Sequence, residues 1–185
     1  MLEKFLDRIA FESYEDLKAN YKVHVPAGFN FAYDVVDVLA QEEPQRRAML
    51  WCDDKGHERT FTFADMARGS SQYAHFFREL GVRKGDKVML VLKRHYEFWF
   101  AILALHKLGA VVVPATNLLK TKDFVYRNNA AQIKMIVCTA DGDVADQVDA
   151  SRAQSPTLVH TVIARGTRPG WRSLEEAAGY PAVYE

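Results

Sequence analysis

Apolar and polar positions along the chain form blocks that predict strands and helices in turn. The most informative block covers residues 81–116. Within it, residues 87–92 have the pattern of a buried strand, residues 98–105 are apolar on every face of a helix, and residues 111–113 are a β-branched run. Gly109 stands where a helix commonly ends in the left-handed conformation. A strand, helix and strand this close together predict a right-handed βαβ crossover.

The alternation continues towards the C-terminus. Helices are predicted at residues 122–131, capped by Thr121, and at 144–152, and strands at 135–138 and 158–163. This order predicts an α/β fold with a doubly wound, mostly parallel sheet and helices on both faces.

The residues before this block predict a different arrangement. A helix over 31–43 follows Asn30, and strands at 48–52 and 58–61 flank a turn, which predicts a hairpin at a sheet edge or in a separate small sheet. A helix follows, capped by Thr62 and Asp65, and its apolar stripe runs to Leu80. We therefore divide the chain into a helical lead-in, residues 1–47, and a partial α/β domain, residues 48–185.

Composition excludes several classes of protein. The 185 residues include 24 basic and 24 acidic side chains, so charge gives no case for binding nucleic acid or an anionic membrane. No apolar run approaches the roughly 20 residues of a membrane span, and the first residues lack the apolar core of a signal peptide. We expect a cytoplasmic protein in which Cys52 and Cys138 are buried free thiols, with a disulfide as the minority alternative.

In a doubly wound sheet, ligands bind at loops beyond the carboxyl ends of the strands, here residues 93–96, 114–121 and 139–143. Neither a Walker phosphate loop nor a dinucleotide-binding glycine motif is present. The segment 166–170, flanked by Arg165 and Arg172, is the nearest candidate for a phosphate loop, but a strand-to-helix turn with solvated arginines fits it better.

No complete active site follows from the residues. The six histidines lack metal-ligand spacing, and no G-x-S-x-G nucleophile motif occurs. We therefore predict neither catalytic residues nor a metal site in this chain.

The ordered motifs nevertheless resemble a known family. Leu-Gly-Val at 80–82, Lys-Gly-Asp-Lys-Val at 84–88, Lys-Leu-Gly-Ala at 107–110 and Val-Pro at 113–114 resemble the N-terminal region of the AMP-forming acyl-CoA synthetases, an adenylate-forming superfamily. The segments 29–40 and 114–116 resemble its medium-chain branch. The resemblance is clear over residues 29–141 and looser elsewhere.

The resemblance implies an acid–thiol ligase that uses ATP, Mg²⁺ and CoA to convert a carboxylic acid to an acyl-adenylate and then to a thioester. The family's phosphate loop, ribose-binding acid and adenylation lysine have no match in residues 1–185. We therefore expect an N-terminal fragment that is inactive alone and binds none of these ligands tightly.

One region of the fragment resembles the CoA entrance of the family. It comprises Thr116, Leu118 and Arg127, although medium-chain relatives tend to carry a polar residue in place of Leu118. Arg127 would contact a phosphate, and the alternative is a solvated helix arginine.

Two further hypotheses remain open. An incomplete sheet would expose an apolar face, through which the fragment would form a homodimer. Alternatively, the chain is a non-catalytic interaction module built on the same half-domain. An unrelated nucleotide-binding α/β protein is a weaker alternative, because the glycine loop is missing.

Overall fold

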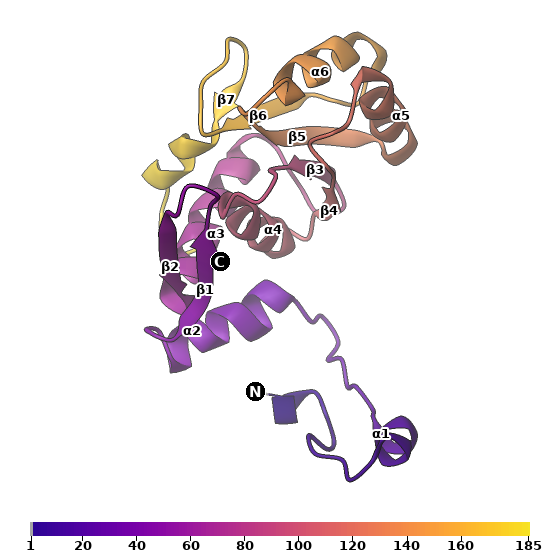
Figure 1. Ribbon diagram of the computed structural model, residues 1–185, viewed down its shortest axis with the longest axis vertical. Helices are drawn as coiled ribbons and strands as arrows, with labels where there is room; N and C mark the ends of the chain where they lie inside the picture. The colour runs from indigo at the N-terminus through magenta and orange to yellow at the C-terminus, as the bar shows by residue number, and fades with distance from the viewer. Residues whose placement is uncertain (1) are drawn as a thin grey trace.

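A five-stranded parallel sheet lies at the centre of the structure, a computed structural model that describes residues 2–185 (Figure 1). Its strands are β3 (Lys87–Val91), β4 (Val111–Pro114), β5 (Ile133–Thr139), β6 (His160–Ala164) and β7 (Arg172–Ser173). They lie in the order β4-β3-β5-β6-β7, and every neighbouring pair is parallel. The chain runs outward from β3 to β4, then crosses back to β5, so the direction of winding changes between β3 and β5. The predicted doubly wound sheet is confirmed.

Helices cover both faces of this sheet. The helices α3 (Phe63–Glu79) and α4 (Glu97–Lys107) and the 3₁₀ segment η4 (Leu174–Gly179) pack on one face; α5 (Thr121–Ala131), α6 (Val144–Ser151) and the 3₁₀ turn η3 (Arg152–Gln154) follow on the other side. Along β3, Val88 and Leu90 enter the first core, whereas Met89 and Val91 enter the second. Both faces of β3, β5 and β6 are therefore buried, so these three strands do not offer the exposed apolar face on which the predicted homodimer depends.

The hairpin forms a separate two-stranded antiparallel sheet from β1 (Arg47–Cys52) and β2 (Glu58–Thr62). Its Phe61 packs with Met66 of α3 and Phe100 of α4 in a third apolar cluster. The prediction of two buried thiols is wrong for Cys52, which is exposed, whereas Cys138 is buried; both are free. A half-covered hairpin has one exposed side, and Cys52 lies on it.

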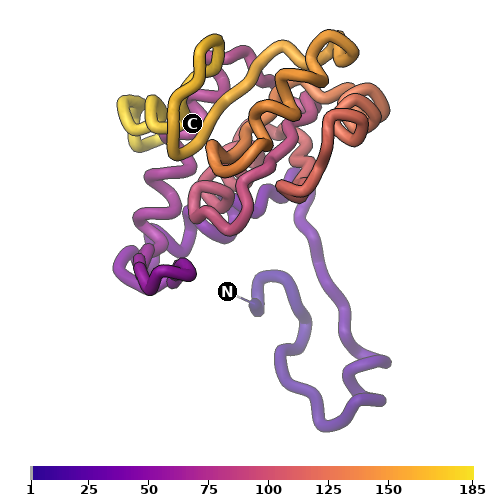
Figure 2. Tube along the Cα trace, turned by 45° about the horizontal axis from the view of Figure 1, so that its top comes forward, coloured from indigo at the N-terminus to yellow at the C-terminus, as the bar shows by residue number. Residues whose placement is uncertain are grey.

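The helix predicted over 31–43 is present as a π-helical segment, η2 (Ala32–Asp37), followed by α2 (Val38–Glu42). Asn30 caps it, because its Oδ1 accepts a hydrogen bond from the backbone N–H of Ala32 at 3.0 Å. The residues before it, with η1 (Leu2–Lys4) and α1 (Tyr14–Asn20), form an arm that extends away from the body (Figure 2). No residue from 2 to 31 is buried.

Some predicted boundaries differ from the structure for local reasons. Strand β5 begins at Ile133, before the predicted start at 135. The strand accommodates the polar residue Lys134 because its Nζ donates to Asp86 at 2.7 Å and to the carbonyl of Gly81 at 2.8 Å. Strand β7 has only two residues, too few to produce a pattern. The cap of α5 is Lys120 rather than Thr121.

No helix among residues 2–185 combines the length and apolar character that crossing a membrane requires.

Candidate functional site

The carboxyl ends of β3, β5 and β6 meet at one edge of the sheet. Two of the three predicted loops, 93–96 and 139–143, lie here on either side of the point where the winding changes direction. The loop after β6, which begins at Arg165, joins them at the same edge. Open α/β sheets place their ligand crevice at such a point, so we take these three loops as the candidate functional site.

Two side-chain contacts connect the loops after β3 and β5. Nε2 of His95 lies 2.8 Å from the hydroxyl of Thr139, and Nζ of Lys93 donates to Asp141 at 3.1 Å. Thr139 is fully buried and His95 is only 8% exposed. The histidine–hydroxyl pair is therefore closed to solvent, and it joins the loops instead of presenting a nucleophile.

Two of these loops contain a non-glycine residue in the left-handed region of backbone space. Lys93 has φ +50° and Arg165 has φ +60°. Each such residue stores on the order of 1 kcal/mol of strain unless its surroundings compensate. Because both begin a loop at the carboxyl edge of the sheet, the strain is concentrated at the candidate site.

Arg165 is the central cation of the site. Its Nε and Nη2 each donate to Glu97 at 2.9 Å, a bidentate pair with a carboxylate that is largely buried. The guanidinium also lies 5.0 Å from the Trp51 ring centre and 4.9 Å from that of Tyr96. The hairpin, the start of α4 and the loop after β6 are thus held together through one arginine.

The other arginines in and beside the segment 166–170 are also paired with carboxylates. Arg168 binds Asp146 at 2.8 Å and Asp149 at 2.7 Å, and Arg172 binds Glu176 at 2.5 Å. The segment 166–170 is a turn, as predicted, and its partly exposed arginines are paired with carboxylates in addition to being solvated. Because carboxylates balance their positive charges, these arginines offer little net positive charge to a triphosphate.

The loops after β5 and β6 approach so closely that only glycine fits at position 166. A Cβ at Gly166 would lie 2.7 Å from Cβ of Ala140. We expect Gly166→Ala to lower the free energy of unfolding by about 1–3 kcal/mol through overpacking. Adding Ala140→Gly should restore most of the loss, as measured by urea denaturation.

Gly179→Ala is the matched control, because nothing lies within 4 Å of the added Cβ. An effect of Gly166→Ala that equals the control would contradict the close approach.

Burial at the site lowers the pKa of His95 from its ordinary 6.5, and the positive charge of Arg165 adds to this effect. Burial also lowers the pKa of His106 and of His160. The unfolded chain then binds protons at a higher pH than the folded chain, so stability should be full above about pH 6.5 and fall as the pH drops below it.

We therefore expect a lower Tm at about pH 5.5 than at about pH 7.5, with a smaller difference in His95→Gln. The same pH dependence in the variant and the parent would exclude a contribution from His95.

The residues predicted for a CoA entrance lie beyond β4. Thr116 and Leu118 share the loop before α5, where the hydroxyl of Thr116 accepts a hydrogen bond from the N–H of Leu118 at 3.3 Å. Leu118 is 76% exposed, and Arg127 is exposed on α5. The loop is joined to the site by Lys120, which binds Asp143 at 2.8 Å. No recorded contact brings Arg127 to Thr116 or Leu118.

Sequence reasoning missed the roles of Lys93, Glu97, Asp141 and Arg165. Lys93 and Arg165 adopt a left-handed backbone conformation, and all four residues form pairs with partners far away in the chain. Neither feature produces a pattern among neighbouring residues of the sequence. Within residues 2–185, no group of three or more histidine, cysteine, aspartate or glutamate side chains is arranged to hold a metal ion.

Comparison with known proteins identifies a family and several relatives. The model of the family described as AMP-binding enzyme matches residues 36–183. Acyl-coenzyme A synthetase ACSM3, mitochondrial, from Mus musculus is 32% identical over 178 residues, covering 92% of this chain and 30% of that protein. Acyl-coenzyme A synthetase ACSM5, mitochondrial, from Rattus norvegicus is 38% identical over 159 residues, covering 82% and 27%. These relatives are named as mitochondrial, so the prediction of a cytoplasmic location is wrong.

Solved structures share the fold. Acetoacetyl-CoA synthetase from Streptomyces lividans matches with a TM-score of 0.75 at 22% identity, covering 85% of this chain and 26% of that chain. The anthranilate CoA ligase AuaEII, in complex with anthranoyl-AMP, matches with a TM-score of 0.73 at 24% identity, covering 87% and 30%. The chain spans about 30% of the length of the curated relatives it matches.

Proposed function

Because the chain belongs to the AMP-binding enzyme family, whose model matches residues 36–183, we propose that it is the N-terminal part of an ATP-dependent acyl-CoA synthetase. The whole enzyme reacts a carboxylic acid with ATP to give an acyl-adenylate and pyrophosphate, then transfers the acyl group to the thiol of CoA with release of AMP. The observation that carries the proposal is the extent of the family match, which includes the whole parallel sheet.

Within such an enzyme, this chain provides structural support and does not supply the residues that bind the triphosphate. The three arginines that follow β6 are all paired with carboxylates, so the donors present do not fit a triphosphate. ATP, Mg²⁺ and CoA are ligands of the whole protein in this proposal. The chain alone is inactive, and the boundary between lead-in and α/β domain at residue 47 remains part of the proposal.

ATP–pyrophosphate exchange and thioester formation test this proposal with a panel of carboxylic acids. We expect turnover by the full-length protein and none by residues 1–185. Turnover by residues 1–185 would overturn the claim of inactivity, and a full-length protein that makes no acyl-adenylate with any acid would overturn the ligase assignment.

We place the CoA entrance of the full-length enzyme at Thr116, Leu118 and Arg127. An exposed guanidinium on α5 suits a phosphate of CoA, because it offers bidentate donors without breaking an internal pair. In the full-length enzyme, Arg127→Gln should raise the KM for CoA about tenfold while the KM for ATP stays unchanged. Equal effects on both constants would contradict this placement.

For self-association, the chain offers the β4 edge instead of the buried faces of the central strands. Val111 is 47% exposed on β4, and Leu118 and Tyr126 are exposed nearby in the chain. Light scattering of residues 1–185 distinguishes this dimer from the alternative of a monomeric interaction module, which predicts a concentration-independent mass.

A further inference from the structure

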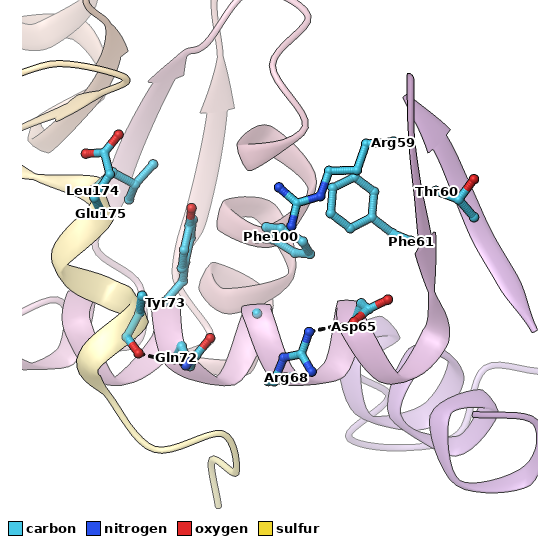
Figure 3. Close-up of a pocket in the computed structure, with 12 residues that line it drawn as sticks. Arg59, Thr60, Phe61, Asp65, Arg68, Gln72, Tyr73, Phe100, Leu174 and Glu175 are labelled. Atoms are coloured by element: carbon cyan, nitrogen blue, oxygen red, sulfur yellow. Dashed lines mark hydrogen bonds and ion pairs between the residues drawn. The ribbon is translucent and has the colours of Figure 1, made fainter. Parts of the chain in front are cut away.

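A cavity of about 210 Å³ lies between the hairpin, α3, α4 and η4, next to the loop of the candidate site that begins at Arg165 (Figure 3). Its walls combine apolar and charged groups and come from segments more than 100 residues apart in the chain. The lining residues are Arg59, Thr60, Phe61, Asp65, Arg68, Gly69, Gln72, Tyr73, Phe100, Leu174, Glu175 and Ala178.

Arg59 reaches this cavity with its guanidinium already fixed in position. The group lies 4.7 Å from the ring centre of Phe61 and 4.9 Å from that of Tyr96, and it donates to the Tyr96 hydroxyl at 2.9 Å. It forms no ion pair with any residue from 2 to 185. Because a guanidinium has five donors, most remain free, and little side-chain entropy is lost when they bind a ligand.

Arg68 supplies a second guanidinium from α3. It donates to Asp65 at 2.6 Å, and that carboxylate also accepts hydrogen bonds from the N–H and hydroxyl of Thr62. The backbone bond from Thr62 is the main cause that lowers the pKa of Asp65. Asp65 is therefore satisfied internally, and the remaining donors of Arg68 stay available to the cavity.

The opposite acid, Glu175, is likewise engaged within the protein. Its carboxylate accepts from the backbone N–H of Arg165 at 2.7 Å and from the hydroxyl of Ser173. In Figure 3 it points away from the space in front of Phe100, whereas Arg59 extends over that ring. The positive groups thus face the centre of the cavity.

The floor of the cavity is aromatic. The ring of Phe100 contacts both of its neighbours, with ring centres 5.4 Å apart for Phe61 and Phe100 and 5.8 Å apart for Tyr73 and Phe100. Burial, with the nearby charge of Glu97, raises the pKa of Tyr73, so its hydroxyl stays a proton donor at neutral pH. Gly69 adds no side chain here, where a Cβ would lie 2.8 Å from the Phe100 ring.

We propose that this cavity binds a small monocarboxylate with a ring or short apolar body, with the carboxylate on Arg59 and Arg68 and the body against Phe100. An engineered cavity of roughly 150 Å³ holds benzene, so 210 Å³ suits one ring and its carboxylate, and it is smaller than pockets for drug-sized ligands. One unpaired guanidinium matches a single negative charge better than a phosphate dianion. This site goes beyond the proposed ligase function, since binding here requires no turnover.

The test is titration of residues 1–185 with benzoate, followed by NMR chemical shifts, with benzamide as the neutral isostere and inorganic phosphate as the competing anion. We expect saturable benzoate binding with a Kd on the order of 1 mM, and at least about tenfold weaker binding of benzamide and phosphate. Arg59→Gln should weaken benzoate binding about tenfold, and Tyr73→Phe, which keeps the ring, severalfold.

Arg47→Gln is the control, because Arg47 is exposed on the same hairpin but does not line the cavity. Equal binding of benzoate and benzamide, tighter binding of phosphate, or no saturation at about 10 mM would overturn the proposal. So would unchanged affinity in both Arg59→Gln and Tyr73→Phe when their spectra show a folded chain.

Discussion

Arg165→Met should lower the free energy of unfolding by about 2–3 kcal/mol, because it leaves the carboxylate of Glu97 without its bidentate partner. Glu97 is 8% exposed, so water does not replace the lost donors, and removal of one partner from a buried pair generally costs about 3–5 kcal/mol. We expect somewhat less here, since the Arg165 side chain keeps 30% exposure. Methionine keeps the apolar stem of arginine and has the same difficulty at φ +60°, so the loss reports the guanidinium, with its ion pair to Glu97 and its contacts with Trp51 and Tyr96.

A double-mutant cycle separates the charge pair from packing. Adding Glu97→Gln to Arg165→Met should recover more than half of the loss, because a neutral amide tolerates burial better than an unpaired carboxylate. Arg152→Met is the control, since its contact with Asp149 is 3.8 Å long and exposed, and it should cost less than about 1 kcal/mol. Urea denaturation of these three variants and of Glu97→Gln alone completes the cycle, and equal losses for Arg165→Met and Arg152→Met would refute the argument.

Asp37→Ala should be similarly destabilising, by about 3 kcal/mol, because it leaves the buried ammonium of Lys107 without its carboxylate partner. The Lys107 side chain is 1% exposed, and its Nζ lies 2.8 Å from Asp37 and donates to the hydroxyl of Ser71 at 3.0 Å. The ring of Tyr33 lies 5.4 Å away and provides only a weak second partner. Without the carboxylate, the cation remains desolvated.

The reverse change should be milder. Lys107→Met leaves Asp37, which is 21% exposed and can be hydrated, and the double variant Asp37→Ala with Lys107→Met should be more stable than Asp37→Ala alone. Glu42→Ala is the control, because its 3.6 Å contact with Lys4 is about half exposed at both ends and should contribute less than about 0.5 kcal/mol. If Asp37→Ala melts like Glu42→Ala in thermal denaturation, the buried pair has no structural role.

These pairs also explain why the N-terminal helical segment belongs to the body of the protein while the arm before it does not. Asp37 of η2 binds Lys107 of α4, and Asn30 donates from its amide to the carbonyl of His106 at 2.7 Å. In the preceding residues, the pair of Arg8 and Asp16 at 2.8 Å lies within the arm, and the contact of Lys4 with Glu42 of α2 is 3.6 Å long and about half exposed at both ends. Burial, rather than helix propensity, decides which part is fixed to the sheet.

The sequence allowed the fold class to be predicted because its signals are local. Apolar runs such as 87–92 and 111–113 identify parallel strands from a few neighbours, and Thr62 with Asp65 forms the predicted capping box within four positions. The three loops at the strand ends followed from the order of strands alone. The family resemblance is confirmed by comparison, and the proposed function rests on it, because the residues by themselves did not specify one.

Only the tertiary structure decided which charges face one another. Arg165 and Glu97 are 68 positions apart, and Lys107 and Asp37 are 70 apart. Each pairing depends on crossover connections and on the docking of the hairpin, which no run of neighbouring residues encodes. The sequence by itself therefore determined every strand except β7, the main helices and the cap at Thr62, whereas the buried ion pairs, the arginine at the candidate site and the cavity beside Phe100 exist because folding brings distant side chains out of water together.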